Sequence, residues 1–382
     1  MRGRPWRLAW GSADVPHAVL DIVRGCNITC RACYNATPTA FKGIEEVRKE
    51  LDRLLDLRRL DSIVLLGGEV TLHPQLCDII RLVREKGVHV EMFTNGLLLD
   101  DGLAASLARA GADLIFVHIE PGQLRPDLPK GSPPSALRRL LEEKVALISR
   151  HGMTAGFSFT AFPDDLDNLM LGIGYAIESP TIEYLLVTLC RDMRAVGEIR
   201  GTLATGLRGE PGRRSANPEK HLTMDRVHQL MSDRLGLRPF AFVPSNRDAD
   251  EFRWLSYLLG CVVREGEPTL CRPILASGFE RLYLTLHRFL SGRASFFQRN
   301  RPGRIRMHLL LNALSGGSAR GNMRLLLDGT FGPGKLKCLR LVFQSPAELD
   351  EEGRVVHCLD CPDATLREGE LVPVCLVDQV VS

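Results

Sequence analysis

"AVLDIVRGCNITC" (residues 18–30) joins a short, mostly apolar run to a loop that holds two cysteines, and Cys33 follows three residues later. Such a run, ended by an Arg-Gly pair, is typical of a buried strand. The same order of a strand followed by a helix recurs through the first half of the chain. The stretch is therefore the first unit of a repeating α/β pattern.

Six apolar runs predict strands at 18–23, 62–66, 88–93, 113–119, 153–162 and 182–190. Helical periodicity between them predicts helices at 44–60, 74–87, 103–111, 135–152 and 165–178. Strands that alternate with helices run parallel and are joined by right-handed crossovers. The fold class is therefore α/β, and six units favour a partial (β/α)6 TIM-like barrel. A doubly wound sheet is the alternative.

The alternation ends near residue 235. We expect an N-terminal extension (1–16), a partial-barrel core (17–235) and a smaller α+β C-terminal domain (236–382) that contains cysteines. Residues 200–221 are rich in Gly, Arg and Pro and predict a long exposed loop. The C-terminal patterns predict helices at 279–290 and 306–314 and short strands at 323–328, 336–343 and 371–378.

The composition is that of an ordinary globular protein, with 45% hydrophobic and 25% charged residues. The net charge of +3 is too small to predict nucleic acid as a partner. No apolar run approaches the roughly 20 residues of a membrane helix, and the basic N-terminus lacks the apolar region of a signal peptide. We therefore expect a cytoplasmic protein, in which the 11 cysteines serve metals or catalysis more often than disulfides.

Polar residues follow the predicted strands where each one ends. Ligands of parallel α/β folds bind at this carboxyl edge, so these side chains are expected to meet on one face. In chain order they are Cys26, Cys30, Cys33, Gly67, Gly68, Glu69, Asn95, His118, Glu120, Ser158 and Cys190.

Cys26, Cys30 and Cys33 can bind a [4Fe–4S] cluster through three thiolates. One of the four irons then has no protein ligand and is open to a small molecule with an amino and a carboxylate group. Zinc held by three cysteines and water is an alternative. A redox pair made of Cys30 and Cys33 is another, although it leaves Cys26 unexplained.

The C-x₃-C-x₂-C spacing after the first strand, with Gly67-Gly68-Glu69 after the second, resembles the radical S-adenosylmethionine (radical SAM) superfamily over roughly residues 17–235. The resemblance implies that the three cysteines ligate a [4Fe–4S] cluster whose open iron binds SAM. It also implies that an electron from a donor such as a flavodoxin or ferredoxin cleaves SAM, and that the 5′-deoxyadenosyl radical abstracts hydrogen from an unidentified substrate. Glu69 would hold the methionine ammonium, and Val70 stands where proline is usual.

Their place along the predicted strands makes Asn95 and Ser158 candidates to face SAM, and makes His118 and Glu120 candidate catalytic residues that line the substrate pocket. Each residue also has a structural explanation. Asn-Gly pairs are common in turns, Ser158 fits an ordinary strand position, and His118 fits a pocket rim. A radical SAM methylase or RNA-modifying enzyme, and a metal-binding module without turnover, are the alternative functions.

The C-terminal cysteines Cys338, Cys358, Cys361 and Cys375 are enough for a second, auxiliary iron–sulfur cluster. Zinc is the competing ligand, because a close cysteine pair with two distant thiols also suits a tetrahedral site. Cys261 and Cys271 are candidates to join this second site or to add a ligand to the first. The arginine-rich stretch 288–306 predicts a solvated surface, with an anionic ligand such as RNA or phospholipid as the alternative.

Overall fold

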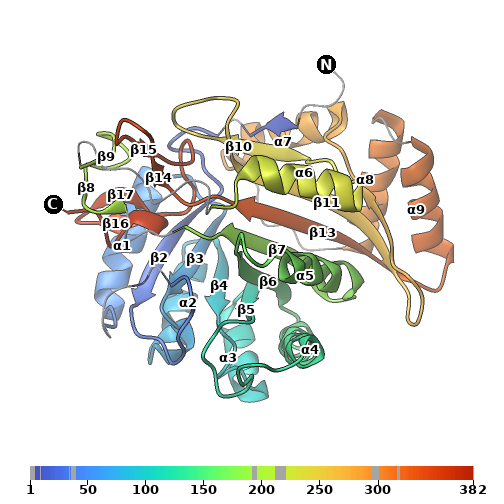
Figure 1. Cartoon of the computed structure of the whole chain (residues 1–382), viewed down its shortest axis with the longest axis horizontal. Coiled ribbons are helices and arrows are strands. Elements are labelled where there is room, and N and C mark those ends of the chain that lie inside the picture. The colour runs from blue at the N-terminus through green and yellow to red at the C-terminus, as the bar shows by residue number, and fades with distance from the viewer. Residues whose placement is uncertain are drawn as a thin grey trace.

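A computed structural model provides the structure of the chain (Figure 1). It describes residues 5–8, 10–33, 35, 40–191, 196–210, 221–294, 301–315 and 319–381.

Six parallel strands form the first part of one large sheet. They are β2 (His17–Val23), β3 (Ser62–Gly67), β4 (His89–Thr94), β5 (Leu114–His118), β6 (Thr154–Ala161) and β7 (Ile182–Leu189). Each strand pairs in parallel with the next one along the chain. A doubly wound sheet would reverse this order at a switch point, so that alternative is wrong and the predicted six-unit partial barrel is confirmed.

Five helices connect these strands and cover one face of the sheet. They are α1 (Ile44–Leu57), α2 (Leu76–Glu85), α3 (Asp101–Ala110), α4 (Pro134–Arg150) and α5 (Leu166–Glu178). Side chains alternate along a strand, so Leu20 and Ile22 of β2 pack into the core with the helices. Val19 of β2 and Val64 of β3 point to the opposite face, where they line a cavity. Figure 1 shows α1, α2 and α3 along the outside of β2–β5.

The same sheet continues beyond β7. Strand β13 (Lys335–Gln344) pairs in parallel with β7, and β11 (Phe252–Val263) pairs antiparallel with β13. Strand β11 also pairs with β10 (Ala241–Pro244) and β12 (Leu270–Pro273), and the N-terminal β1 (Trp6–Arg7) adds to β10. One sheet thus crosses residue 235, and the domain boundary there remains a prediction.

Helices lie between the late strands: α6 (Met224–Leu235) before β10, then α7 (Gly278–Ser291), α8 (Pro302–Ser315) and α9 (Ala319–Phe331) between β12 and β13. The prediction of a strand at 323–328 is wrong, because these residues belong to α9. A run of three leucines fits either structure. The helix is favoured because Asn322, Leu325 and Gly329, three and four residues apart, are buried together on one side.

The C-terminal tail forms two small hairpins, β14 (Glu348–Leu349) with β15 (Val355–Val356) and β16 (Ala364–Arg367) with β17 (Glu370–Pro373). Two short helical turns, η1 (Val70–Leu72) and η4 (Val374–Leu376), follow Glu69 and Pro373. The predicted strand at 371–378 is thus the end of β17 followed by η4. Hairpin strand β16 packs against β2, and His17 Nε2 lies 2.6 Å from Asp363 Oδ1. The tail therefore returns to the first strand of the barrel.

Two further expectations concern loops and cysteines. The short strand β8 (Ile199–Arg200) lies at the start of the predicted loop 200–221 and pairs with β9 (Arg208–Gly209) inside it, while 211–220 lie outside the described residues. Cys261 and Cys271 face each other across β11 and β12 and form a disulfide. The expectation that they ligate a metal is therefore wrong, because each sulfur is already bonded to the other. Among the described residues, no helix is long and apolar enough to cross a membrane.

Candidate functional site

The residues predicted at the carboxyl edge of the strands lie around one cavity of about 270 Å³. Its wall includes Cys26, Cys30, Cys33, Gly67, Gly68, Glu69, Asn95, His118, Ser158 and Cys190. Glu120 is buried beside this set but is not part of the wall. The sequence therefore identified the edge at which the polar residues gather, while their roles remain predictions.

The glycine pair brings the end of β3 against the segment that precedes Cys26. The backbone N–H of Gly68 donates to the Val23 carbonyl (2.6 Å), and that of Glu69 donates to the Gly25 carbonyl (2.8 Å). A Cβ atom at Gly68 would overlap the Gly25 carbonyl, and Gly67 has a φ of +142°. Only glycine fits both demands, so this pair fixes the cysteine loop next to Glu69.

Glu69 is a buried carboxylate, 1% exposed, in the wall of the cavity. Its Oε1 accepts from the Thr71 N–H (3.1 Å), the Thr71 hydroxyl (2.5 Å) and the Thr94 hydroxyl (2.6 Å). Its Oε2 accepts from the Asn95 N–H at 2.7 Å and from no other donor among the residues that the structure describes. These donors are neutral, and no Lys, Arg or His in the described part of the chain forms an ion pair with Glu69. A buried anion of this kind can accept a further, cationic partner at Oε2.

We call Cys26, Cys30 and Cys33 the loop cysteines, and all three are free thiols. Cys26 Sγ lies 3.8 Å from Asn95 Nδ2, and Cys30 Sγ lies 3.5 Å from Gln123 Nε2. Burial, with Glu120 and Cys33 nearby, raises the pKa of the Cys30 thiol to about 12. Without a metal the Cys30 thiol therefore keeps its proton, which metal binding would release.

Gln123 and Arg125 contribute to the site although no sequence motif pointed to them. Arg125 is 5% exposed and donates to Gln123 Oε1 (2.9 Å) and to the Asn95 carbonyl (3.0 Å). It is held in turn by a two-point ion pair with Asp127. This buried arginine fixes the Gln123 amide and the backbone of Asn95, the two residues whose side chains contact Cys30 and Cys26. The only sequence signal was the position of residues 123–127 directly after the fourth predicted strand.

In the described part of the chain, no three His, Cys, Asp or Glu side chains surround a single point closely enough to hold one metal ion. A cubane cluster makes a different demand, because each thiolate binds a different iron of a larger body. The free thiols beside the buried Glu69 are candidate ligands of such a cluster, and zinc stays the alternative.

His118 and Ser158 share the cavity wall below this edge. His118 Nδ1 lies 3.1 Å from Ser158 Oγ, and its Nε2 lies 3.7 Å from Glu120 Oε2. The same oxygen of Glu120 accepts from the Thr160 N–H at 2.8 Å. Glu120 thus stands behind His118, so His118 is the member of the predicted pair that reaches the cavity.

Three of the four C-terminal cysteines line the same cavity: Cys358, Cys361 and Cys375, here called the tail trio. Asp360, between the first two, has a left-handed φ of +47°, and burial together with the neighbouring Cys358 thiol raises the pKa of the Cys361 thiol. Two buried arginines lie beside this pair. Arg58 donates to the Cys361 carbonyl (3.0 Å), and the charge of Arg253 interacts with Cys358.

Cys338 is placed apart from the tail trio. It pairs with Gly260 on β11 and packs with Leu258, Ile305 and Leu325 under α8 and α9. Val342, which does line the cavity, is four residues further along the same strand, or about 13 Å. The structure therefore does not bring Cys338 together with the other three, because its register on β13 directs it to a different cluster.

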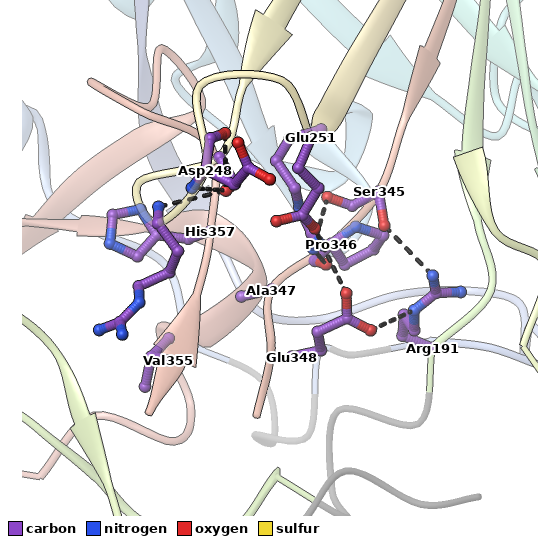
Figure 2. Close-up of polar contacts among 12 residues, drawn as sticks. Arg191, Asp248, Glu251, Ser345, Pro346, Ala347, Glu348, Val355 and His357 are labelled. Atoms are coloured by element: carbon purple, nitrogen blue, oxygen red, sulfur yellow. Dashed lines mark hydrogen bonds and ion pairs between the residues drawn. The ribbon is translucent and has the colours of Figure 1, made fainter. Parts of the chain in front are cut away.

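An ion-pair network holds the segment that contacts the tail trio (Figure 2). Arg253, 1% exposed, lies 2.5 Å from Glu348 Oε1, and Arg191 lies 3.4 Å from Glu348 Oε2. Figure 2 shows Arg191 bridging Glu348 and Ser345. Burial alone would raise the pKa of Glu348, but the two guanidinium groups hold it below its ordinary value. The network fixes Ala347, whose N–H donates to Cys375 Sγ at 3.4 Å.

Comparison with known proteins gives one family match. The family model described as "Radical SAM superfamily" matches residues 20–125, which include the loop cysteines, Gly67–Glu69, Asn95, His118 and Glu120.

Curated relatives match over part of the chain. The tungsten-containing aldehyde ferredoxin oxidoreductase cofactor-modifying protein of Pyrococcus furiosus is 30% identical over 111 residues, 26% of this chain and 30% of that protein. The Fe-coproporphyrin III synthase of Methanosarcina barkeri is 31% identical over 108 residues, 28% of this chain and 27% of that protein. The match thus spans less than a third of each relative. A solved structure of Streptococcus suis SuiB bound to the precursor peptide SuiA has a TM-score of 0.37 at 15% identity, covering 46% of this chain and 39% of that one.

Proposed function

Because the chain belongs to the radical SAM superfamily, we propose that it is an enzyme that reductively cleaves SAM at a [4Fe–4S] cluster held by the loop cysteines. Held by the loop cysteines, a reduced cluster would supply the one electron that cleaves SAM to methionine and a 5′-deoxyadenosyl radical, and this radical would take a hydrogen atom from the substrate. The protein's own residues bind, orient and shield these groups.

The observation that carries the proposal is the buried Glu69 next to the loop cysteines. A carboxylate that is 1% exposed and has only neutral donors gains from a cationic partner, and the methionine ammonium of SAM is such a cation. The Asn95 N–H and the hydroxyls of Thr71 and Thr94 orient the carboxylate before SAM arrives. Asn95 is proposed to add contacts through its side chain, which already reaches toward Cys26.

The substrate is proposed to occupy the interior of the partial barrel, below the SAM site. This part of the cavity is lined by Phe93, Phe116, Tyr184 and Trp254. The rings of Phe93 and Phe116 stack with centroids 4.5 Å apart. Such walls favour a substrate with apolar or aromatic surface. His118 and Ser158 reach the cavity nearest to the carboxyl edge and are proposed to position the substrate there, with Glu120 orienting His118.

The tail trio is proposed to hold an auxiliary iron–sulfur cluster. Its three thiols line the cavity, and the buried cations Arg58 and Arg253 lie next to them, which suits an anionic thiolate centre. Cys338 is not part of this proposal, because it packs under α8 and α9. Electrons are proposed to come from a small donor protein such as a ferredoxin or flavodoxin.

The test is anaerobic reconstitution with iron and sulfide, followed by incubation with SAM and a strong reductant. The proposal predicts 5′-deoxyadenosine and methionine in equal amounts, and neither product from a Cys30→Ala variant. SAM labelled on its methyl group separates the methylase alternative, which requires label in a product other than methionine. A fully reconstituted protein that leaves SAM intact would contradict the proposal.

A further inference from the structure

The residues from 278 to 331, here called the helical insertion, turn large apolar side chains toward solvent. Helix α7 carries Leu282, Leu286, Phe289 and Leu290 on one side, since residues four, seven and eight apart share a helix face. That face is exposed, with Phe289 at 83% and Leu290 at 73%. Glu280 is the only buried residue of α7. The apolar side of this amphipathic helix therefore points away from the protein.

Helices α8 and α9 add to the same surface. Met307, Leu310 and Leu314 of α8, and Leu327 and Phe331 of α9, are exposed as well. Across the described residues, 10 of the 14 exposed large apolar side chains belong to the helical insertion. Isolated exposed leucines are normal, but a concentration of this kind marks a surface that is covered by a partner. Figure 1 shows the three helices together, away from α1–α3.

The helical insertion also carries far more basic than acidic side chains. Residues 278–331 contain nine arginines against two acidic residues, although the net charge of the whole chain is only +3. The first acid, Glu280, is buried and bonded to Ser277 and Asn312. Arg281, Arg301, Arg304 and Arg320 are exposed and form no ion pair with any acidic side chain that the structure describes. The surface is therefore both apolar and cationic.

Apolar and cationic side chains lie together in a groove between α8 and α9. Leu314 and Leu327 line the same shallow groove as Arg320, Arg324 and Asp328, and the Asp328 carboxylate lies 3.8 Å from Arg324. A partner at this place contacts leucine side chains and guanidinium groups together.

We propose that the helical insertion binds the surface of an anionic phospholipid membrane, with α7 lying in the plane of the interface. Leucine and phenylalanine side chains enter the acyl boundary, while arginines meet the lipid phosphates. With 14 residues, α7 is about 21 Å long, and no described helix could span the bilayer, so the contact is peripheral. The proposal is independent of the proposed SAM chemistry.

Other occupants fit less well. A second copy bound through the same face would place arginines against arginines, which repel each other. Nucleic acid would engage the arginines through phosphates, but it gives no role to the exposed leucines and phenylalanines of α7. A lipid surface uses both kinds of side chain.

The test is flotation of the full chain with vesicles of phosphatidylcholine alone or of phosphatidylcholine with phosphatidylglycerol. We expect binding to the anionic vesicles only, weakened by salt. An apolar variant combines Leu282→Ser, Leu286→Ser, Phe289→Ser and Leu290→Ser. A charge variant combines Arg281→Glu, Arg304→Glu and Arg320→Glu. Each is expected to weaken vesicle binding at least about tenfold.

The control combines Leu98→Ser and Leu171→Ser, two exposed leucines outside the helical insertion, and is expected to bind like wild type. Thermal melting checks that each variant is folded, and Phe289→Ser alone replaces the apolar variant if the latter does not fold. Equal binding to neutral vesicles, or wild-type binding by either variant, overturns the proposal. So does the absence of binding to anionic vesicles. A dimer that the apolar variant abolishes would then identify a second copy as the occupant, and RNA binding that this variant retains would identify nucleic acid.

Discussion

Replacing Glu69 with alanine tests the proposed contact with the SAM ammonium. The substitution removes a buried charge-assisted hydrogen bond worth about 1.5–3 kcal/mol, which corresponds to a loss of roughly ten- to a hundredfold in SAM affinity. It also leaves the Thr71, Thr94 and Asn95 donors without their acceptor, so the apo protein should lose about 1–3 kcal/mol of stability for each donor that finds no water. The loop cysteines are untouched, and the iron content should stay the same.

Glu69→Gln should weaken SAM binding nearly as much as Glu69→Ala. Oε1 of Glu69 accepts three hydrogen bonds and Oε2 accepts one, so the glutamine NH₂ group would occupy the Oε2 place. There it would face the Asn95 N–H, and two donors repel each other. The matched control is Glu91→Gln, a buried carboxylate in the same cavity wall that is held by the Ser62 hydroxyl at 2.5 Å. It should leave SAM binding unchanged.

The assay is calorimetric titration of SAM into anaerobically reconstituted wild type, Glu69→Ala, Glu69→Gln and Glu91→Gln. Iron content and a melting curve of each sample separate loss of binding from loss of the cluster or the fold. Equal SAM affinity in wild type and Glu69→Ala would refute the reasoning, because Gly67-Gly68-Glu69 would then be only a turn that anchors the cysteine loop.

Three further predictions concern the thiols and one buried acid. Replacing any single loop cysteine with alanine should remove about four irons per chain, as counted by colorimetric assay, and full retention in all three variants would exclude the cluster. Wild type should contain about eight irons per chain, and a Cys358→Ser/Cys361→Ser variant about four. Cys338→Ser should leave the iron content unchanged. Zinc in place of the second four irons would mean that the tail trio has a structural role. Burial, opposed by the charge of Arg24, raises the pKa of Asp21 from 3.8 to about 6. The folded state therefore holds a proton on Asp21 that the unfolded state releases, and the free energy of unfolding falls as pH rises from about 4 to 6. Asp21→Asn should remove this loss, at most about 3 kcal/mol, from denaturation curves, and an unchanged pH profile would contradict the shift.

The barrel was predictable because its signals are local and repeated. Six apolar runs and five helical periods predicted β2–β7 and α1–α5, with each end within three residues of the observed one. No local sequence pattern distinguishes a partial barrel from a doubly wound sheet. The difference depends on strand order and on helices covering one face only, both of which follow from packing that no single segment specifies.

The C-terminal half was harder to predict for related reasons. The leucines at 325–327 fit a strand pattern as well as a helix, and packing against the sheet favours α9. Cys338 was grouped with the tail trio by proximity in sequence, but its register opposite Gly260 directs it elsewhere. Gln123 and Arg125 form no motif, so their contacts with the cysteine loop appear only in three dimensions.

The central claim is that the loop cysteines hold a cluster whose open iron binds SAM beside Glu69. The most direct measurement is electron paramagnetic resonance of the reduced, reconstituted protein with and without SAM carrying ¹⁵N in its amino group. The account predicts that SAM changes the cluster signal and that the labelled nitrogen couples magnetically to it. A cluster spectrum that is identical with and without SAM would contradict the account.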